Sequence, residues 1–358
     1  MQKKDQSIFT KSLEFDDHEG VMYLRDESTG LRGFIAIHNT NLGPAVGGTR
    51  FRHYKNETEA LQDALRLSRA MTYKCAAAGV PYGGGKAVLM APKKITKHQK
   101  EIYLTAYTHC LELLHGHFFT GEDVGLDAHD ITVLAKHSDS IIGRPRVGGM
   151  PARWAAHSVY RAMSVALKER FGSESFKGRV CAIKGLGNVG IALCALITKA
   201  GGSVIAADIN HTRVRLARKR FQNIRIVPHT KIHTYATDIY APCALGDEFN
   251  AVTIRQLRCS IICGAANNQL ATREDGKRLF TRGILYIPDY VANAGGLINV
   301  VDELHKGGYS KSRVAKNVAY VATTVQQIIA GSRRQHQPTN DIADAIAEKR
   351  FHRGRARV

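Results

Sequence analysis

The chain has 358 residues, of which 44% are apolar and 23% charged, so it is long enough for roughly two domains with packed cores. This composition excludes disordered, collagen-like and coiled-coil proteins. The 51 Lys and Arg residues exceed the 31 Asp and Glu residues by 20 formal charges. These charges are spread out except at 213–220 and 349–357, and no nucleic-acid-binding signature accompanies them, so a nucleic-acid partner is disfavoured.

The sequence also argues against a membrane or secreted protein. A membrane-spanning helix needs about eighteen consecutive uncharged, apolar residues, and the sequence contains no such stretch. The first residues also lack the apolar core of a secretory leader. The seven cysteines are odd in number and form no CxxC pair. We therefore expect reduced thiols, no metal site and a cytoplasmic location.

The first 150 residues mix strands and helices. Short apolar runs predict strands at 21–24 and 33–38, and a glycine run leads into a strand at 87–90. Apolar residues spaced three and four apart predict a helix over 57–78, and a second helix is expected at 98–114. Asn56 is a suitable N-cap for the first of these helices, and Gly79 and Pro81 end it.

After a cluster of glycine and proline near residues 140–150, which we interpret as a hinge, the pattern alternates between strand and helix. A helix is predicted at 153–171, a strand at 179–184, a helix at 189–200 and a strand at 203–207. Further apolar runs follow, and a helical region is expected at about 312–351. This alternation predicts an α/β protein: an N-terminal α/β domain followed by a doubly wound, Rossmann-type domain.

A glycine loop stands where the second domain begins. Gly185, Gly187 and Gly190 match GxGxxG between a predicted strand and helix, and Asp208 follows 21 residues after Gly187. The first glycine permits a tight turn, the second lets a pyrophosphate approach the backbone, and the third allows close helix packing. Asp208 would bind ribose hydroxyls and repel a 2′-phosphate, which favours NAD. Arg213 and Arg215 are close enough in sequence to keep NADP open.

Two lysines of the first domain stand in unusual settings, and Asp123 lies in a polar segment, 120–125, between predicted elements. Lys74 lies near the end of the predicted amphipathic helix, and Lys86 follows three glycines. Burial and a neighbouring like charge both lower the pKa of a lysine, so such a residue can act as a base; alternatively, both are surface lysines. Asp123 could exchange protons with an amine, or it could be a turn or capping residue.

Several segments together resemble one family. They are 43–50, 71–86 ending in Gly-Gly-Gly-Lys, 120–125, 185–190, 264–270 (GAANNQL) and 288–299 (PDYVANAGGLIN). In this order the chain resembles the Glu/Leu/Phe/Val amino-acid dehydrogenases, and it is most similar to the leucine dehydrogenase branch.

The resemblance implies reversible NAD-dependent oxidative deamination of an L-amino acid to a 2-oxo acid and ammonium. It implies that Lys74 binds the substrate carboxylate, Lys86 activates the attacking water, and Asp123 moves protons at the amine nitrogen. It also implies a homo-oligomer and a substrate domain at 1–142, completed by helices at about 330–358. The NAD-binding domain would span 143–329, with a cleft between the two domains.

The same resemblance assigns the remaining site residues. The positions that would bind substrate are Leu42, Gly43, Gly47, Gly48, Gly121, Asn293, Leu297 and Val300. The positions that would bind the coenzyme are Gly185, Gly187, Asn188, Val189, Gly190, Asp208, Ile209, Ala265, Ala266, Asn267 and Asn268, with Asn267 and Asn268 beside the nicotinamide.

By the same resemblance, Leu42, Gly121, Leu297 and Val300 would face the substrate side chain. All four are apolar, so an acidic substrate is disfavoured. Gly121 is expected to leave space for an aromatic side chain, and the choice among Leu, Val, Phe and Trp stays open.

The sequence departs from the family pattern at three positions. Ala152, Ala155 and Ala265 stand where the family usually has hydroxyl residues or serine near the nicotinamide. Together with the basic charge, these losses motivate an alternative interpretation. In that alternative the chain is a non-catalytic or regulatory dinucleotide-binding homologue that binds a polyanion.

Overall fold

A computed structural model describes residues 12–145, 147–244 and 246–354. The chain divides into two compact units: one holds the residues up to 149 together with 300–310 and those from 347 onward, and the other holds 150–299 and 311–346. Each unit is built on its own sheet, which confirms the predicted α/β class. The predicted functional boundaries, at 142/143 and about 330, remain predictions.

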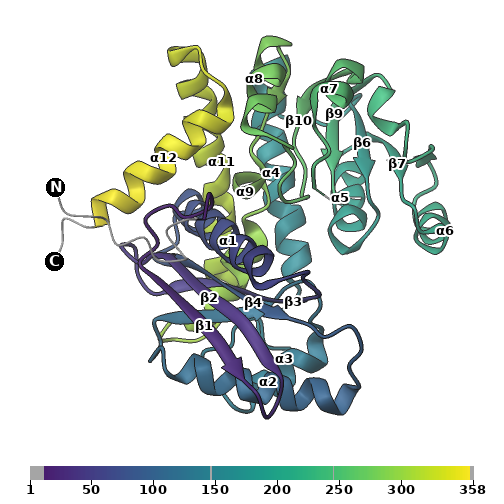
Figure 1. Ribbon diagram of the computed structural model, residues 1–358. Coiled ribbons are helices and arrows are strands. Elements are labelled where there is room, and N and C mark those ends of the chain that lie inside the picture. The colour runs from purple at the N-terminus through teal and green to yellow at the C-terminus, as the bar shows by residue number, and fades with distance from the viewer. Residues whose placement is uncertain (1–11, 146, 245, 355–358) are drawn as a thin grey trace. The chain divides into compact units, whose positions relative to one another are not determined.

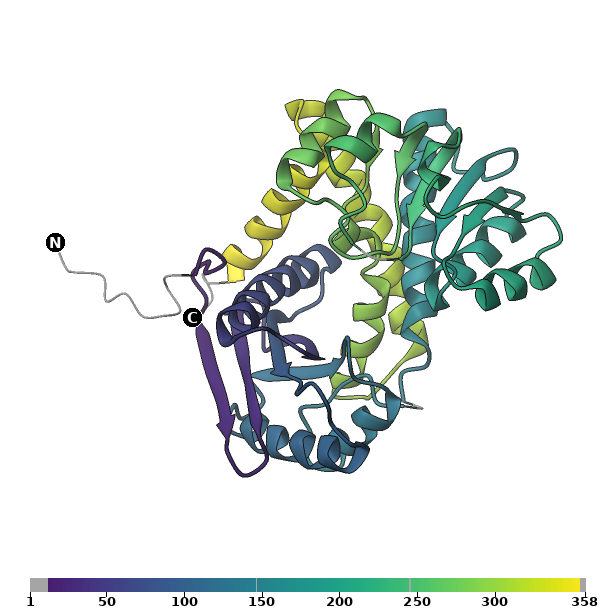
Figure 2. The same ribbon diagram turned by 45° about the vertical axis from the view of Figure 1, so that its right-hand side comes forward.

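The first unit contains a five-stranded sheet in the order β1-β2-β4-β3-β5. Its strands are β1 (Gly20–Asp26), β2 (Leu31–Asn39), β3 (Ala45–Arg52), β4 (Gly83–Met90) and β5 (Phe118–Glu122). β1 and β2 form an antiparallel hairpin, visible as the purple strands in Figure 2, whereas β3 pairs in parallel with both β4 and β5. β3 therefore lies between the strands that carry Lys86 and lead to Asp123.

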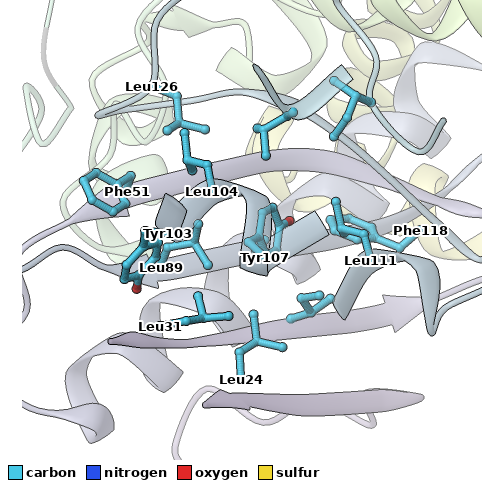
Figure 3. Packing of buried hydrophobic residues seen from close by; sticks show 14 of the residues in the cluster. Leu24, Leu31, Phe51, Leu89, Tyr103, Leu104, Tyr107, Leu111, Phe118 and Leu126 are labelled. Carbon is cyan, nitrogen blue, oxygen red and sulfur yellow. The ribbon is translucent and has the colours of Figure 1, made fainter. Parts of the chain in front are cut away.

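Helices cover both faces of this sheet (Figure 1). α1 (Glu57–Ala78) packs on the face that carries Phe34 and Val88. α2 (Lys97–Glu112) and α3 (Ala128–Ala135) pack on the opposite face, where Leu89 contacts the core shown in Figure 3. The alternation of side chains along β4 thus separates two cores.

The predicted ends of α1 are confirmed. The Asn56 side chain accepts a hydrogen bond from the backbone N–H of Glu59, and Gly79 ends the helix in the left-handed conformation, which glycine adopts without a steric cost.

The second unit contains a six-stranded parallel sheet in the order β11-β10-β9-β6-β7-β8. Its strands are β6 (Val180–Lys184), β7 (Ser203–Ala207), β8 (Arg225–Ile226), β9 (Thr237–Pro242), β10 (Cys259–Ile262) and β11 (Leu285–Tyr286). The chain reverses its direction of winding after β8, which confirms the doubly wound arrangement.

The helical segments from residue 151 onward follow the predicted alternation. They are α4 (Pro151–Phe171), α5 (Asn188–Lys199), α6 (His211–Arg220), η1 (Ile232–Thr234), α7 (Ala251–Gln256), α8 (Arg273–Thr281), α9 (Asp289–Ala292), α10 (Gly295–Val301), η2 (Asp302–Leu304), α11 (Lys311–Gln335) and α12 (Thr339–Gly354). The region expected to be helical at 312–351 is thus two helices. Pro338 precedes α12, and a proline is well tolerated beside the start of a helix.

Candidate functional site

Lys86 and Asp123 come together on the sheet of the first unit. Lys86 lies in β4, and Asp123 directly follows β5. The strand between them, β3, carries Gly48, where an added Cβ would lie 3.2 Å from Lys86 Nζ and 3.1 Å from Asp123 Cβ. Because Gly48 has no side chain, the lysine can reach across β3, and its Nζ donates a hydrogen bond to Asp123 Oδ2.

Arg50 extends this contact into a charged network. Its Nε donates to Asp123 Oδ1 at 3.1 Å, and its Nη1 donates to Asp63 Oδ2 at 2.9 Å. The Tyr54 hydroxyl donates to the same oxygen of Asp63 at 2.7 Å. Arg66 Nη2 pairs with the other oxygen of Asp63 at 2.8 Å but is 44% exposed. The side chains of Lys86 and Asp123 are 5% and 20% exposed, so the contact between these two groups is largely desolvated.

The surroundings shift the ionisation of the pair. Burial lowers the pKa of Lys86, and the Asp123 carboxylate opposes part of that effect. Burial raises the pKa of Asp123, but the nearby Lys86 and Arg50 cations outweigh it and lower the pKa to about 2. A lysine with a lowered pKa beside a carboxylate can hold and release a proton, which is the requirement for general acid–base chemistry.

Lys74 lies near the C-terminal end of α1 and is half-buried. The glycine run before Lys86 explains how this helix approaches the sheet: a Cβ at Gly84 would collide with the backbone nitrogen of Thr72. Because the glycines of β4 have no side chains, the helix backbone can lie directly against the strand. This close approach fixes the part of α1 that carries Lys74.

The glycines predicted to bind substrate have clear structural roles as well. Leu42 and Gly43 lie between β2 and β3, and Gly43 adopts φ +143°, with its carbonyl accepting a hydrogen bond from Gly83 N at 3.1 Å. A Cβ at Gly47 would collide with the Gly85 carbonyl oxygen. These glycines allow β3 and the loop before it to pack closely on β4. Their contact with substrate remains a prediction.

The expected space at Gly121 is not there. A Cβ at this position would lie 2.7 Å from the carbonyl oxygen of Ile142, because the chain at 141–142 runs beside β5. The glycine is therefore required by a neighbouring backbone, and the inference that it makes room for an aromatic substrate was wrong. Of the other apolar positions, Leu297 is buried and Val300 is half-buried.

The glycine loop of the second unit fits the geometry that a pyrophosphate requires. Gly185 adopts φ +104°, and a Cβ at Gly190 would collide with the Gly185 carbonyl oxygen. Gly187 is the N-cap of α5 and has no side chain to cap it, while Asn188 is exposed and Val189 is half-buried at the helix start. Backbone N–H groups at this helix end are thus suited to bind an anion.

Asp208 follows β7, as predicted. Its Oδ2 accepts a hydrogen bond from Leu186 N at 2.6 Å, and its Oδ1 accepts one from Asn210 N at 2.7 Å. The carboxylate holds the glycine loop in place, and lone pairs remain on its two oxygens for ribose hydroxyls. Ile209, the next residue, is 72% exposed.

A second loop of this unit brings Asn267 to Asn293. The Nδ2 of Asn293 donates to Asn267 Oδ1 at 2.8 Å and to the Ala265 carbonyl at 3.1 Å. Among the described residues, the buried Oδ1 of Asn293 has no hydrogen-bond partner. A ligand that offers a hydrogen-bond donor here would satisfy this atom, so the residues present fit a bound nicotinamide amide.

Two members of this loop have backbone roles. Ala266 donates its N–H to the Pro242 carbonyl at 2.9 Å. Asn268 is exposed and adopts φ +53°, a conformation that asparagine tolerates better than most residues. The loop therefore holds its exposed asparagines on a constrained backbone.

Sequence reasoning missed the roles of Arg50 and Asp63. Asp63 lies on α1 beside the apolar residues Leu61, Ala64 and Leu65, and its side chain is only 11% exposed. An acidic residue next to an otherwise buried helix face was the available signal, because such a carboxylate needs a partner.

Residues 18–140 match the family model described as "Glu/Leu/Phe/Val dehydrogenase, dimerisation domain", and residues 148–350 match the model "Glutamate/Leucine/Phenylalanine/Valine dehydrogenase". The chain therefore belongs to the Glu/Leu/Phe/Val dehydrogenase family. As the fold and the recognised relatives together establish, it is an amino-acid dehydrogenase, an oxidoreductase.

Its relatives are similar over nearly their whole length. The chain is 42% identical to a leucine dehydrogenase of Geobacillus stearothermophilus, covering 95% of this chain and 92% of the relative. It is 38% identical to an L-tryptophan dehydrogenase of Nostoc punctiforme, covering 93% of each chain. The crystal structure of L-tryptophan dehydrogenase from Nostoc punctiforme superposes with a TM-score of 0.84, covering 95% of this chain and 97% of that one.

Two negative findings apply to residues 12–145, 147–244 and 246–354. No helix in these ranges combines the length and hydropathy needed to cross a membrane. No group of three or more His, Cys, Asp or Glu side chains in them is arranged to hold a metal ion.

Proposed function

We propose that this chain catalyses the reversible, NAD-dependent oxidative deamination of an apolar L-amino acid, giving the 2-oxo acid and ammonium. The observation that carries the proposal is the buried contact between Lys86 and Asp123 in a chain that belongs to the amino-acid dehydrogenases. A desolvated amine and a carboxylate in contact supply the two proton-transfer groups that deamination needs.

Bound NAD+ supplies the hydride acceptor for the oxidation of the α-carbon. In our assignment the Lys74 ammonium binds the substrate carboxylate, and Asp123 accepts a proton from the amine as the imine forms. The neutral amine of Lys86 then accepts a proton from the water that attacks the imine carbon. Asp123 returns a proton to the nitrogen, and Lys86, after giving its proton to solvent, accepts the hydroxyl proton as the C–N bond breaks. The carbinolamine then leaves as the 2-oxo acid and ammonia, which takes up a proton from solvent to become ammonium.

The environment of Lys86 favours this role. Burial lowers its pKa, which reduces the free energy needed to form the neutral amine at mildly alkaline pH. Arg50 contacts the other oxygen of Asp123 and keeps the carboxylate oriented while its partner changes protonation. Arg50 is therefore a positioning residue, since it acts through Asp123.

The coenzyme and substrate classes have separate support. The glycine loop and Asp208 fit a dinucleotide. The loop at 265–268 lies beside Asn293, whose buried Oδ1 has no hydrogen-bond partner within the part of the chain that the structure describes. Leu42, Leu297 and Val300 are apolar, which favours an apolar substrate. The similar proteins include leucine, phenylalanine and L-tryptophan dehydrogenases, so branched and aromatic amino acids are the two candidate substrate classes.

We further propose that residues 1–142 and the C-terminal helices bind the amino acid, that residues 143–329 bind NAD, and that the protein is a cytoplasmic homo-oligomer. The match of residues 18–140 to a model described as a dimerisation domain supports the homo-oligomer.

The test is reduction of NAD+ by the purified protein with a panel of L-amino acids at mildly alkaline pH. We expect reduction with one or a few apolar amino acids and none with glutamate, and we expect Lys86→Ala to lower kcat by about 10²-fold or more. A folded protein that binds NADH but reduces no NAD+ with any substrate would refute the proposal and favour a regulatory homologue.

A further inference from the structure

A cavity of about 530 Å³ lies beside the glycine loop of the second unit. One wall is formed by residues 186–188, at the start of α5, where the pyrophosphate is expected to bind. The other wall is α6, which contributes Arg213, Lys219 and Arg220. A coenzyme bound at the loop would therefore have three cationic side chains along one edge of its site.

The charged residues of α6 are all basic. α6 reads HTRVRLARKR and contains no acidic residue. Among the described residues, no carboxylate lies within ion-pair distance of Lys219 or Arg220, and both are exposed. The one carboxylate at this place is Asp208, whose Oδ2 lies 3.8 Å from Arg213 Nη1.

Asp208 is poorly placed to exclude an additional anion. Its side chain is 4% exposed, and both of its oxygens already accept backbone N–H groups. An acid at this position discriminates against a 2′-phosphate by repulsion, but here Arg213 offsets that charge and remains 54% exposed. A guanidinium can bind a phosphate through two parallel hydrogen bonds.

From this arrangement we propose that the dinucleotide site accepts a 2′-phosphate on the adenosine ribose, that NADP is therefore a second coenzyme, and that Arg213 binds the phosphate. The sequence left both Arg213 and Arg215 open for this role. The cavity distinguishes them, because Arg213 lines it and Arg215 does not. The inference deepens the proposed function, since it rests on the glycine loop being a dinucleotide site.

The test uses the full-length protein and two probes that contain neither nicotinamide nor amino acid: ADP-ribose and 2′-phospho-ADP-ribose. Binding is measured by calorimetry at physiological ionic strength, where weak surface attraction is screened. We expect the 2′-phosphorylated probe to bind with an affinity no more than tenfold below that of ADP-ribose. If it binds more than tenfold more weakly while ADP-ribose binds, the inference is overturned and the NAD-dependent function stands.

Substitutions then identify the residue. Arg213→Gln is expected to weaken 2′-phospho-ADP-ribose at least tenfold more than it weakens ADP-ribose. Arg215→Gln, the matched control on the same helix, should change both affinities less than twofold. An equal loss in the two variants would show that the basic helix acts only through its general charge, which would overturn the role of Arg213.

Turnover provides the second measurement. The ratio of kcat/KM for NADP+ to that for NAD+ should fall in Arg213→Gln and stay constant in Arg215→Gln; a constant ratio in both variants contradicts the inference. Failure of ADP-ribose itself to bind would overturn both this inference and the proposed function. Because binding of the probes needs no catalysis, a protein that binds both probes but turns over no substrate would refute the proposed function and leave the inference about the 2′-phosphate standing.

Discussion

Gly48→Ala tests whether the contact between Lys86 and Asp123 depends on the missing side chain of β3. The added methyl group would lie 3.1 Å from Asp123 Cβ and 3.2 Å from Lys86 Nζ. Carbon atoms in favourable contact are separated by about 3.5–4.0 Å, so the pair must shift by about 0.4 Å or more. The substitution therefore displaces the two proposed proton-transfer groups without removing either of them.

The expected effect follows from these distances. A displacement of 1 Å in a catalytic group costs about 10²-fold in rate, so a shift of about 0.4 Å should lower kcat/KM by about five- to tenfold. Added volume in a packed site destabilises a protein by about 1–3 kcal/mol. We expect the lower end of that range, because the lysine amine is the end of a long side chain that can adjust.

The assay compares kcat/KM and urea unfolding of Gly48→Ala with those of Gly20→Ala. Gly20 begins β1 and has no heavy atom within 4 Å of an added Cβ, so this control adds the same methyl group without a collision. The control should retain wild-type activity. Wild-type kcat/KM in Gly48→Ala would refute the reasoning, because it would show that the position of this pair does not limit the reaction.

Three further predictions concern pH and stability. Because burial lowers the pKa of Lys86 and the neutral amine is the active form, kcat/KM should rise with pH, with a midpoint below the ordinary lysine value; a rate that falls across mildly alkaline pH would contradict this. Burial and His18 lower the pKa of His38 from 6.5 to about 4, so its neutral form stabilises the fold above pH 6.5. As the pH falls from 6.5 toward 4, up to about 3 kcal/mol of unfolding free energy should be lost. His38→Gln should remove that part of the pH dependence in urea unfolding, and an unchanged dependence would count against the assignment. Arg350 Nη1 donates to the carbonyls of Ala76 and Ala77 at 2.8 and 3.0 Å, at the end of the helix that carries Lys74. Arg350→Met should lower the free energy of unfolding by about 1.5–3 kcal/mol. Arg333→Met, which breaks an exposed 3.4 Å ion pair, should lower it by less than about 1 kcal/mol; equal losses would argue against a stabilising role of the Arg350 contact.

The sequence was most informative where local signals agree. The helix at 57–78 has a capping residue, an apolar face and a terminating glycine, and the structure gives the same bounds. The strand, glycine loop and helix around 180–199 were likewise close to the observed elements. In these segments the local preference and the tertiary contacts favour the same conformation.

The strands that hold the candidate site were harder to recognise. β3 contains Gly47 and Gly48, and β5 contains Gly121, although glycine is depleted in strands. The structure shows why these glycines occur: backbone or side-chain atoms of neighbouring segments occupy the places of their missing Cβ atoms. Such a requirement arises from tertiary packing, so the sequence alone gave no sign of it and misled the interpretation of Gly121.

Only part of the charged network could be predicted from the sequence. Lys86 and Asp123 stood out by their surroundings, but their connection through Arg50 to Asp63 depends on the order of the strands. Periodicity predicts individual elements, whereas strand order is set by contacts distant in sequence. The contact of Arg350 with α1 could not be predicted for the same reason, because Arg350 follows Ala77 by 273 positions in the sequence.

Transfer of the substrate's α-hydrogen tests the central claim most directly. The protein is incubated with NAD+ and an apolar L-amino acid deuterated at the α-carbon, and the label, the ammonium and the 2-oxo acid are measured together. The account predicts one deuterium in each reduced nicotinamide, with equal amounts of ammonium and 2-oxo acid. Ammonium released without reduction of the coenzyme, or reduced coenzyme that carries no deuterium, would contradict it.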